Sequence, residues 1–72
     1  MENDIFQEMD DRWTSAIVAR TEIERFTGGM ISRKYIANLD SEGYGPVRVT
    51  IGRKVGYPTR DLVQWLRKRS NT

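Results

Sequence analysis

The sequence predicts an α+β fold, in which a helix-turn-helix is followed by a β-hairpin wing and a C-terminal packing helix. Two neighbouring glycines, Gly28 and Gly29, separate two segments of helical pattern. Residues 47–51 then alternate between apolar and polar side chains, as a half-buried strand does. Residues 59–69 carry a broad apolar face and end in three cations, which is typical of a packed terminal helix. A chain of 72 residues has room for one such small domain.

The composition narrows the chemistry that we expect of this chain. It contains no cysteine and no histidine, which excludes disulfides, thiolate metal sites, histidine-activated nucleophiles and the usual zinc ligand sets. We therefore expect a protein that is not an enzyme and holds no cofactor or metal. No apolar run approaches the roughly 18 residues of a membrane span, and no secretory signal opens the chain. The expected location is the cytoplasm, without a membrane partner.

The charges divide the chain into two parts of opposite sign. Residues 1–12 carry five carboxylates against Arg12 alone, a net charge of −4. Residues 13–72 carry eleven cations against five carboxylates, a net charge of +6. A basic body suggests a polyanionic partner, because cations that neutralise phosphates release condensed counterions. We therefore treat residues 1–12 as an acidic N-terminal leader and residues 13–72 as the domain.

Two alternatives stay open for the acidic leader. Ile5, Phe6 and Met9 have roughly helical spacing, so the leader is either an amphipathic turn or helix that docks Phe6 and Met9 on the core, or a disordered segment. We favour partial order.

The first part of the domain is predicted to be an extended lead-in followed by a short helix. The lead-in is expected to include a short strand with Ile17 buried, and Trp13 is expected in the core rather than as a base-stacking platform. Thr21 and Glu24 have the spacing of a capping box, and the helix that they open runs to about Thr27. The two glycines that follow end it, one of them in a left-handed conformation.

The second helix, residues 32–41, is the centre of the functional prediction. Ser32 is a favourable N-cap because its hydroxyl can accept from a backbone N–H of the first turn. At about 100° per residue, Ile36 lies on one side of this helix, and Lys34 and Asn38 lie on the other. An asparagine can pair with adenine in the major groove, and a lysine can reach guanine or phosphate. A solvated surface helix would show the same pattern, and the context has to decide between these two interpretations.

The strand at residues 47–51 is expected to turn back into residues 55–57 and form a wing. A two-residue loop would mix apolar and polar side chains on each face, whereas a three-residue loop pairs Ile51 with Val55. We predict the three-residue loop, which also pairs Val49 with Tyr57. Cations at the outer face or tip of this wing are expected to contact the DNA backbone or minor groove. The alternative is that their charges protect an exposed strand edge from pairing with another chain. These cations are Arg48, Arg53 and Lys54.

The last helix is predicted to begin at Thr59 as its N-cap, after Pro58 stops the strand. Its apolar residues, above all Trp65 and Leu66, are expected in the core. The cations at residues 67–69 are assigned first to the negative end of the helix dipole and only second to DNA.

Several separated blocks of this sequence resemble a known family. The blocks are residues 28–34, 37–41, 43–46, 52–55 and 57, with Trp65 and Leu66 near the end. They are similar to the small winged helix-turn-helix proteins of prophages and mobile elements, the excisionase-like and AlpA-like proteins, which are related in fold to MerR DNA-binding domains. The likeness covers about Ala16 to Arg69. Tyr35 stands where that pattern has a smaller threonine.

The resemblance implies sequence-specific binding of double-stranded DNA, with the second helix in the major groove and the wing, residues 47–57, at the backbone or minor groove. Lys34 and Asn38 would meet base edges, and Arg33 and Tyr35 the flanking phosphates. The full set of expected DNA-binding residues is Ser32, Arg33, Lys34, Tyr35, Asn38, Arg48, Arg53 and Lys54.

The expected partners follow from this function. An excisionase would act beside an integrase or recombinase, and a small transcriptional regulator near RNA polymerase; the sequence does not separate the two. Cooperative self-association on DNA is expected because a single small module buries little surface. The alternative from another class is a protein-interaction adaptor of the same fold that binds an acidic protein. An RNA binder is a weaker third alternative, since no stacking pair is evident on a sheet face.

Overall fold

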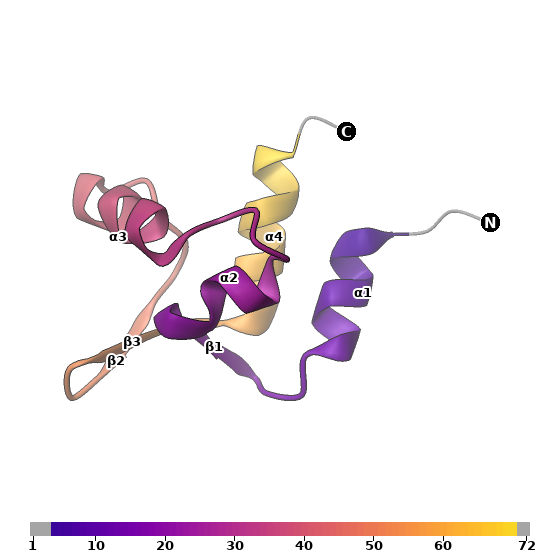
Figure 1. The fold of residues 1–72 in the computed structure, drawn as a ribbon, viewed down its shortest axis with the longest axis horizontal. Coiled ribbons are helices and arrows are strands. Elements are labelled where there is room, and N and C mark those ends of the chain that lie inside the picture. Colours follow the sequence, from indigo (N-terminus) through magenta and orange to yellow (C-terminus); the bar gives the residue numbers. More distant parts are fainter. Residues whose placement is uncertain (1–3, 71–72) are drawn as a thin grey trace.

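Residues 4–70 are described by a computed structural model, and they form four α-helices and a three-stranded antiparallel sheet (Figure 1). In chain order the elements are α1 (Ile5–Arg12), β1 (Ile17–Ala19), the 3-10 turn η1 (Arg20–Glu22), α2 (Ile23–Phe26), α3 (Arg33–Glu42), β2 (Val49–Ile51), β3 (Lys54–Pro58) and α4 (Thr59–Arg69). The strand order is β1-β3-β2, so that both β1 and β2 are edge strands. The predicted α+β class is thereby confirmed.

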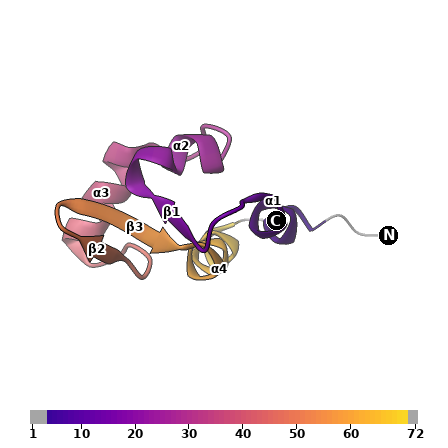
Figure 2. The same cartoon turned by 90° about the horizontal axis from the view of Figure 1, so that it is seen from below.

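The helices are distributed along the length of the molecule. Figures 1 and 2 agree that α3 and the β2–β3 hairpin lie at one end, α4 in the middle and α1 at the opposite end. No helix in the described part of the chain is long and apolar enough to cross a membrane.

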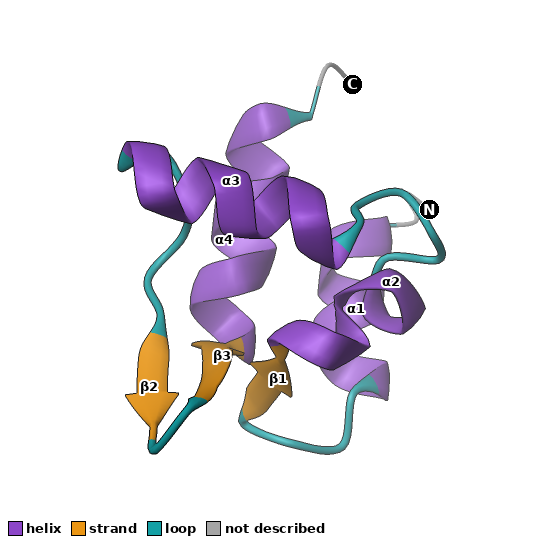
Figure 3. Cartoon of the chain, turned by 60° about the vertical axis from the view of Figure 1, so that its left-hand side comes forward, coloured by secondary structure: helices purple, strands orange, loops and turns teal. Residues whose placement is uncertain are grey.

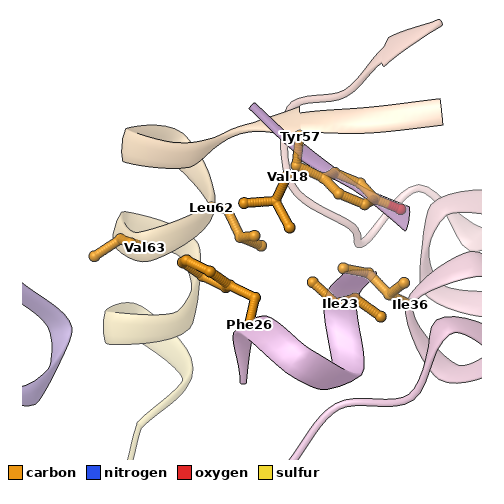
Figure 4. Close-up of a cluster of buried hydrophobic side chains, with 7 residues drawn as sticks. All are labelled: Val18, Ile23, Phe26, Ile36, Tyr57, Leu62 and Val63. Atoms are coloured by element: carbon orange, nitrogen blue, oxygen red, sulfur yellow. The ribbon is translucent and has the colours of Figure 1, made fainter. Parts of the chain in front are cut away.

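The core is built from one or two side chains each of β1, α2, α3, β3 and α4. Seven buried hydrophobic residues form it (Figure 4): Val18, Ile23, Phe26, Ile36, Tyr57, Leu62 and Val63. Trp13 packs against this core with its ring edge-to-face on Phe26, at 5.2 Å between ring centroids, which confirms its expected place. Trp65 and Leu66 also pack on the core, but they are only half-buried.

The acidic leader contains a helix that docks on the rest of the protein. Asp4 caps α1 by accepting from the backbone N–H groups of Phe6 and Gln7. Phe6 and Met9 pack against the core, and α1 packs along α4. Arg67 of α4 lies 3.1 Å from Asp4 and stacks over the ring of Phe6. The docked helix was one of the two alternatives for the leader; its residues 1–3 lie outside the described part.

The short strand β1 differs from its prediction by one residue. Val18 is the buried side chain, and Ile17 is half-buried on the other face. Successive residues of a strand point to opposite faces, so a shift of one residue exchanges the two sides. The outer face has room for Ile17 because Gly56 faces it, and a Cβ at that glycine would lie 2.8 Å from Ile17 Cδ1.

The predicted capping box at the start of the first helix of the motif is wrong. The 3-10 turn η1 already begins at Arg20, so Thr21 lies inside it and not at an N-cap. The residues at the N-cap positions, Ala19 and Glu22, make no side-chain capping hydrogen bond. Glu24 is therefore free to bind elsewhere, and it contacts the start of α3.

The predicted register of the hairpin is also wrong. Its loop has two residues, which pairs Ile51 with Lys54 and Val49 with Gly56. Gly52 has a φ of 62°, and a glycine of positive φ at the first loop position is what a tight type II′ hairpin turn requires. The three-residue loop was predicted to give β2 a buried apolar face, but β2 is an exposed edge strand throughout.

The start of α4 corrects one further prediction. Thr59 is the first residue of the helix rather than its N-cap, and Pro58 occupies the cap position without a side-chain bond. The Thr59 hydroxyl instead donates to the carbonyl of Ser15 at 2.8 Å. This bond ties the start of α4 to the segment before β1.

Candidate nucleic-acid interface

The turn between α2 and α3 holds the two helices in a defined relation. Both Gly28 and Gly29 adopt positive φ, whereas the sequence analysis predicted a left-handed conformation for one of them. The hydroxyl of Thr27 accepts from the backbone N–H of Ile31 at 3.1 Å and donates to a carbonyl of α2. Ser32 caps α3 as predicted, since its hydroxyl accepts from the backbone N–H of Tyr35 at 3.0 Å.

A carboxylate of α2 reaches across to the first residue of α3. Glu24 Oε2 accepts from the backbone N–H of Arg33 at 2.8 Å, and the Arg33 guanidinium lies 3.6 Å from the same oxygen. The backbone hydrogen bond, assisted by the guanidinium charge, lowers the pKa of Glu24. A negative charge at the N-terminus of a helix is stabilised by the helix dipole, so the Glu24 carboxylate makes a favourable link between α2 and α3.

The outward face of α3 carries the residues that the sequence places there. Lys34 and Asn38 are exposed, while Ile36 on the opposite side is fully buried. Neither of the two outward side chains binds another side chain within residues 4–70. In Figure 3 the helix crosses the front of the molecule, above the hairpin. The predicted assignment of faces is confirmed for this helix.

The flanks of α3 are exposed but already bound to other parts of the protein. The Tyr35 side chain is 43% exposed, and its hydroxyl accepts from Arg69 Nη2 at 3.0 Å. Arg69 in turn stacks over the ring of Trp65. Arg33 is paired with Glu24, as described above. A phosphate near either flank would compete with these contacts or add to them.

The hairpin carries two of its three expected cations at its tip. Arg53 and Lys54 are exposed and pair with no carboxylate in the described part of the chain. Arg48 was expected beside them on the outer face or tip, and that placement is wrong. Its Nη1 atom lies 3.9 Å from Asp40 Oδ1, because the segment that leads from α3 into β2 turns this side chain toward α3.

The structure also reveals a buried polar cluster that the sequence analysis did not predict. Asp40 is 6% exposed, and its Oδ2 accepts from Arg20 Nη2 and from the Tyr57 hydroxyl, each at 2.6 Å. Arg20 Nε also donates to the Tyr57 hydroxyl at 3.0 Å. A signal was present in the sequence, since Asp40 lies four residues after Ile36 and therefore on the buried side of the helix.

The electrostatics of this cluster favour the neutral phenol and the charged guanidinium. Burial, helped by the hydrogen bond to Asp40, raises the pKa of Tyr57 to about 12. The hydrogen bonds from Arg20 to Tyr57 and then to Asp40 raise the pKa of Arg20. The cluster is therefore a charged pair bridged by an un-ionised hydroxyl.

The expected site residues thus gather in two groups at one end of the molecule. Five lie on or cap α3, namely Ser32, Arg33, Lys34, Tyr35 and Asn38, and two lie at the hairpin tip. Within residues 4–70 no group of acidic side chains is placed to hold a metal ion. Compared with known proteins, the chain matches no family model, no curated protein and no solved structure.

Proposed function

We propose that this protein is a winged helix-turn-helix protein that binds double-stranded DNA sequence-specifically and catalyses no reaction. The observation that carries the proposal is the arrangement of α3. Its inner side is held on the core by Ile36, and its outer side presents Lys34 and Asn38 at the same end as the cationic hairpin tip. A helix with such an outer face fits the major groove of DNA.

The two outward residues of α3 have the chemistry to read bases. An asparagine side chain can donate to and accept from adenine together, and a lysine can reach the O6 and N7 acceptors of guanine. Arg33 and Tyr35 flank them and are proposed to contact phosphates, which would fix the helix in its register. Ser32, the N-cap of α3, is exposed, and its hydroxyl is also proposed to contact a phosphate.

The hairpin is proposed to act as the wing. Arg53 and Lys54 would contact the backbone or the adjacent minor groove, and each neutralised phosphate would add to the salt dependence. Arg48 contributes less to this electrostatic attraction, because Asp40 offsets part of its charge.

The resemblance to excisionase-like and AlpA-like proteins suggests two biological settings. In recombination the protein would act beside an integrase or recombinase, and in transcription near RNA polymerase. A single module of this size buries on the order of 600–1,000 Å² on DNA, so strong binding calls for several copies or a protein partner.

A protein-interaction adaptor is the second candidate function, and one observation favours it. Val47, Val49 and Ile51 are exposed, and an apolar hollow of about 90 Å³ lies between β2 and Ile17 of β1. Exposed apolar surface of this kind is typical of protein contacts. In this case the cations would serve to attract an acidic protein.

The experiment that tests the proposal measures fluorescence anisotropy with a random duplex and with duplexes selected from a random library, each across a salt series. Lys34→Ala and Asn38→Ala are expected to weaken binding to the selected duplex by about 1–3 kcal/mol and to narrow its preference over random DNA. Arg53→Ala is expected to weaken all duplexes alike and to lower the salt slope by about one.

The matched controls come from the exposed side of α4. Lys68→Ala removes one cation, and Gln64→Ala removes one amide, at positions outside the proposed interface. Neither is expected to change the preference for the selected duplex. Absence of binding to any duplex at low salt would overturn the proposal, and the adaptor would then be tested by its binding to acidic proteins in the presence of competitor DNA.

A further inference from the structure

The carboxylate of Asp40 links α3 to three other segments of the chain. Asp40 belongs to α3, Arg20 to the turn η1, Tyr57 to β3, and Arg48 to the segment before β2. Within residues 4–70, the bond from Tyr57 is the one side-chain hydrogen bond that joins α3 to the β2–β3 hairpin. A single buried acid thus connects the proposed recognition helix to the proposed wing.

The two oxygens of this carboxylate have different surroundings. Oδ2 accepts both short hydrogen bonds, from Arg20 and Tyr57. Oδ1 is buried without a hydrogen-bond partner, and the guanidinium of Arg48 lies 3.9 Å from it. A buried carboxylate oxygen without a partner is unfavourable, so its charge attracts the Arg48 side chain and with it the start of β2.

The backbone between α3 and β2 is closed tightly over the same oxygen. A Cβ at Gly45 would overlap Asp40 Oδ1, so this position accommodates only a glycine. Gly43 ends α3 with a φ of 83°, which turns the chain back toward the carboxylate. The path from α3 into the hairpin is therefore shaped around Asp40.

We infer that Asp40 is a positioning residue that sets the orientation of the β2–β3 hairpin relative to α3, so that both can engage one duplex at the same time. The inference rests on the proposed function, because it assigns the helix and the hairpin to neighbouring parts of the DNA. Asp40 itself is too deeply buried to touch DNA. It acts through Arg48 and Tyr57, which hold the hairpin.

The first test measures this orientation in the protein without DNA. Residual dipolar couplings of backbone amides report the angle between α3 and the hairpin. Asp40→Asn keeps the shape of the side chain but removes the charge that holds Arg20 and Arg48. It is expected either to change the angle between α3 and the hairpin or to make that angle variable, which would average the couplings of the hairpin. Asp61→Asn, at an exposed carboxylate in the first turn of α4, makes the same change of charge and is expected to leave the angle as it is.

The second test asks whether the hairpin still works together with α3 on a random duplex of fixed length. In the otherwise unchanged protein, the pair of substitutions Arg53→Ala and Lys54→Ala is expected to lower the slope of log K against log salt by about two. In the Asp40→Asn background the same pair is expected to lower it by less than one. A purely structural role for Asp40 would reduce the folded fraction and hence all affinities, but it would leave this difference in slope unchanged.

The outcomes separate the inference from the function on which it rests. If the unchanged protein binds no duplex, the proposed function fails, and the dipolar couplings alone decide whether Asp40 orients the hairpin. If it binds, and Asp40→Asn shows the original angle and the original slope difference, the inference is overturned. If Asp40→Asn does not fold, Tyr57→Phe replaces it in both tests, because it removes the linking hydroxyl and keeps the buried ring.

Discussion

The hydroxyl of Tyr57 donates a 2.6 Å hydrogen bond to Asp40 Oδ2 and thereby joins the central strand of the sheet to α3. The Tyr57 side chain has no exposed surface. Its burial, followed by its bond to the Asp40 carboxylate, raises the pKa of the phenol from 10.0 to about 12. The folded protein therefore holds this proton more tightly than the unfolded chain does.

Stability is predicted to fall at alkaline pH because of this phenol. The contribution of Tyr57 is present in full below pH 10, the unfolded pKa, and is lost as the pH rises from 10 toward 12. A difference of about two pKa units corresponds to about 3 kcal/mol over that range. Urea unfolding of the original protein and of Tyr57→Phe at several pH values between 9 and 11.5 checks this. An equal loss of stability in both proteins would contradict the prediction.

The contact between Glu24 and Arg33 is predicted to protect the start of α3. Glu24→Ala removes the acceptor of the Arg33 backbone N–H, so that amide is expected to exchange with solvent several-fold faster. In the original protein, the protection of this amide relative to its intrinsic exchange rate is expected to be lost only at a pH below the ordinary pKa of a glutamate, because the backbone hydrogen bond lowers the pKa of Glu24. Hydrogen exchange followed by NMR measures both effects.

The control for this contact is Glu22→Ala. Glu22 pairs with Arg25 at 3.4 Å, and it makes no bond to α3 within the described residues. Its removal is expected to leave the exchange of the Arg33 amide unchanged. Similar acceleration by both substitutions would show that the general loss of negative charge, and not the bond, is responsible.

Gly52 is predicted to be required for the two-residue hairpin loop. A Cβ would meet no atom within 4 Å, so the effect of Gly52→Ala comes from the backbone, whose φ of 62° is unfavourable for alanine. We expect a loss of about 1 kcal/mol in the free energy of unfolding, measured with urea. Arg53→Ala, at the next position and with negative φ, is the control and is expected to change stability by less than about 0.5 kcal/mol. No loss for Gly52→Ala would contradict the observed loop.

The features that the sequence predicted correctly depend on neighbours in the chain. Ser32 caps α3 because its hydroxyl reaches an N–H three residues ahead. Ile36 and Lys34 fall on opposite sides of α3 because the helical period alone places them there. The left-handed glycines before α3 likewise need no information from the rest of the fold.

The features that were missed depend on residues far away. The alternation around Val49 suggested a half-buried strand, but no second layer formed by residues 4–70 covers β2, which is an edge strand. Its register is therefore decided by the turn at Gly52. Asp40 is buried because Arg20 and Tyr57, 20 and 17 residues away, come to meet it. A periodic pattern places Asp40 on the inner side of the helix but does not name those partners. Whether the exposed face of α3 binds DNA stays a prediction.

Alanine substitutions of two isoleucines, one in the core and one on an edge strand, are predicted to have very different effects on the free energy of unfolding. Ile36 is fully buried, so Ile36→Ala should lower the free energy of unfolding by about 2–5 kcal/mol through lost burial and a cavity. Ile51 is 70% exposed, so Ile51→Ala should change it by less than about 0.5 kcal/mol. The same chemical change at both sites makes each the control of the other, and urea unfolding measures both. A large loss for Ile51→Ala would instead favour the three-residue loop, in which this side chain faces Val55 on a buried surface.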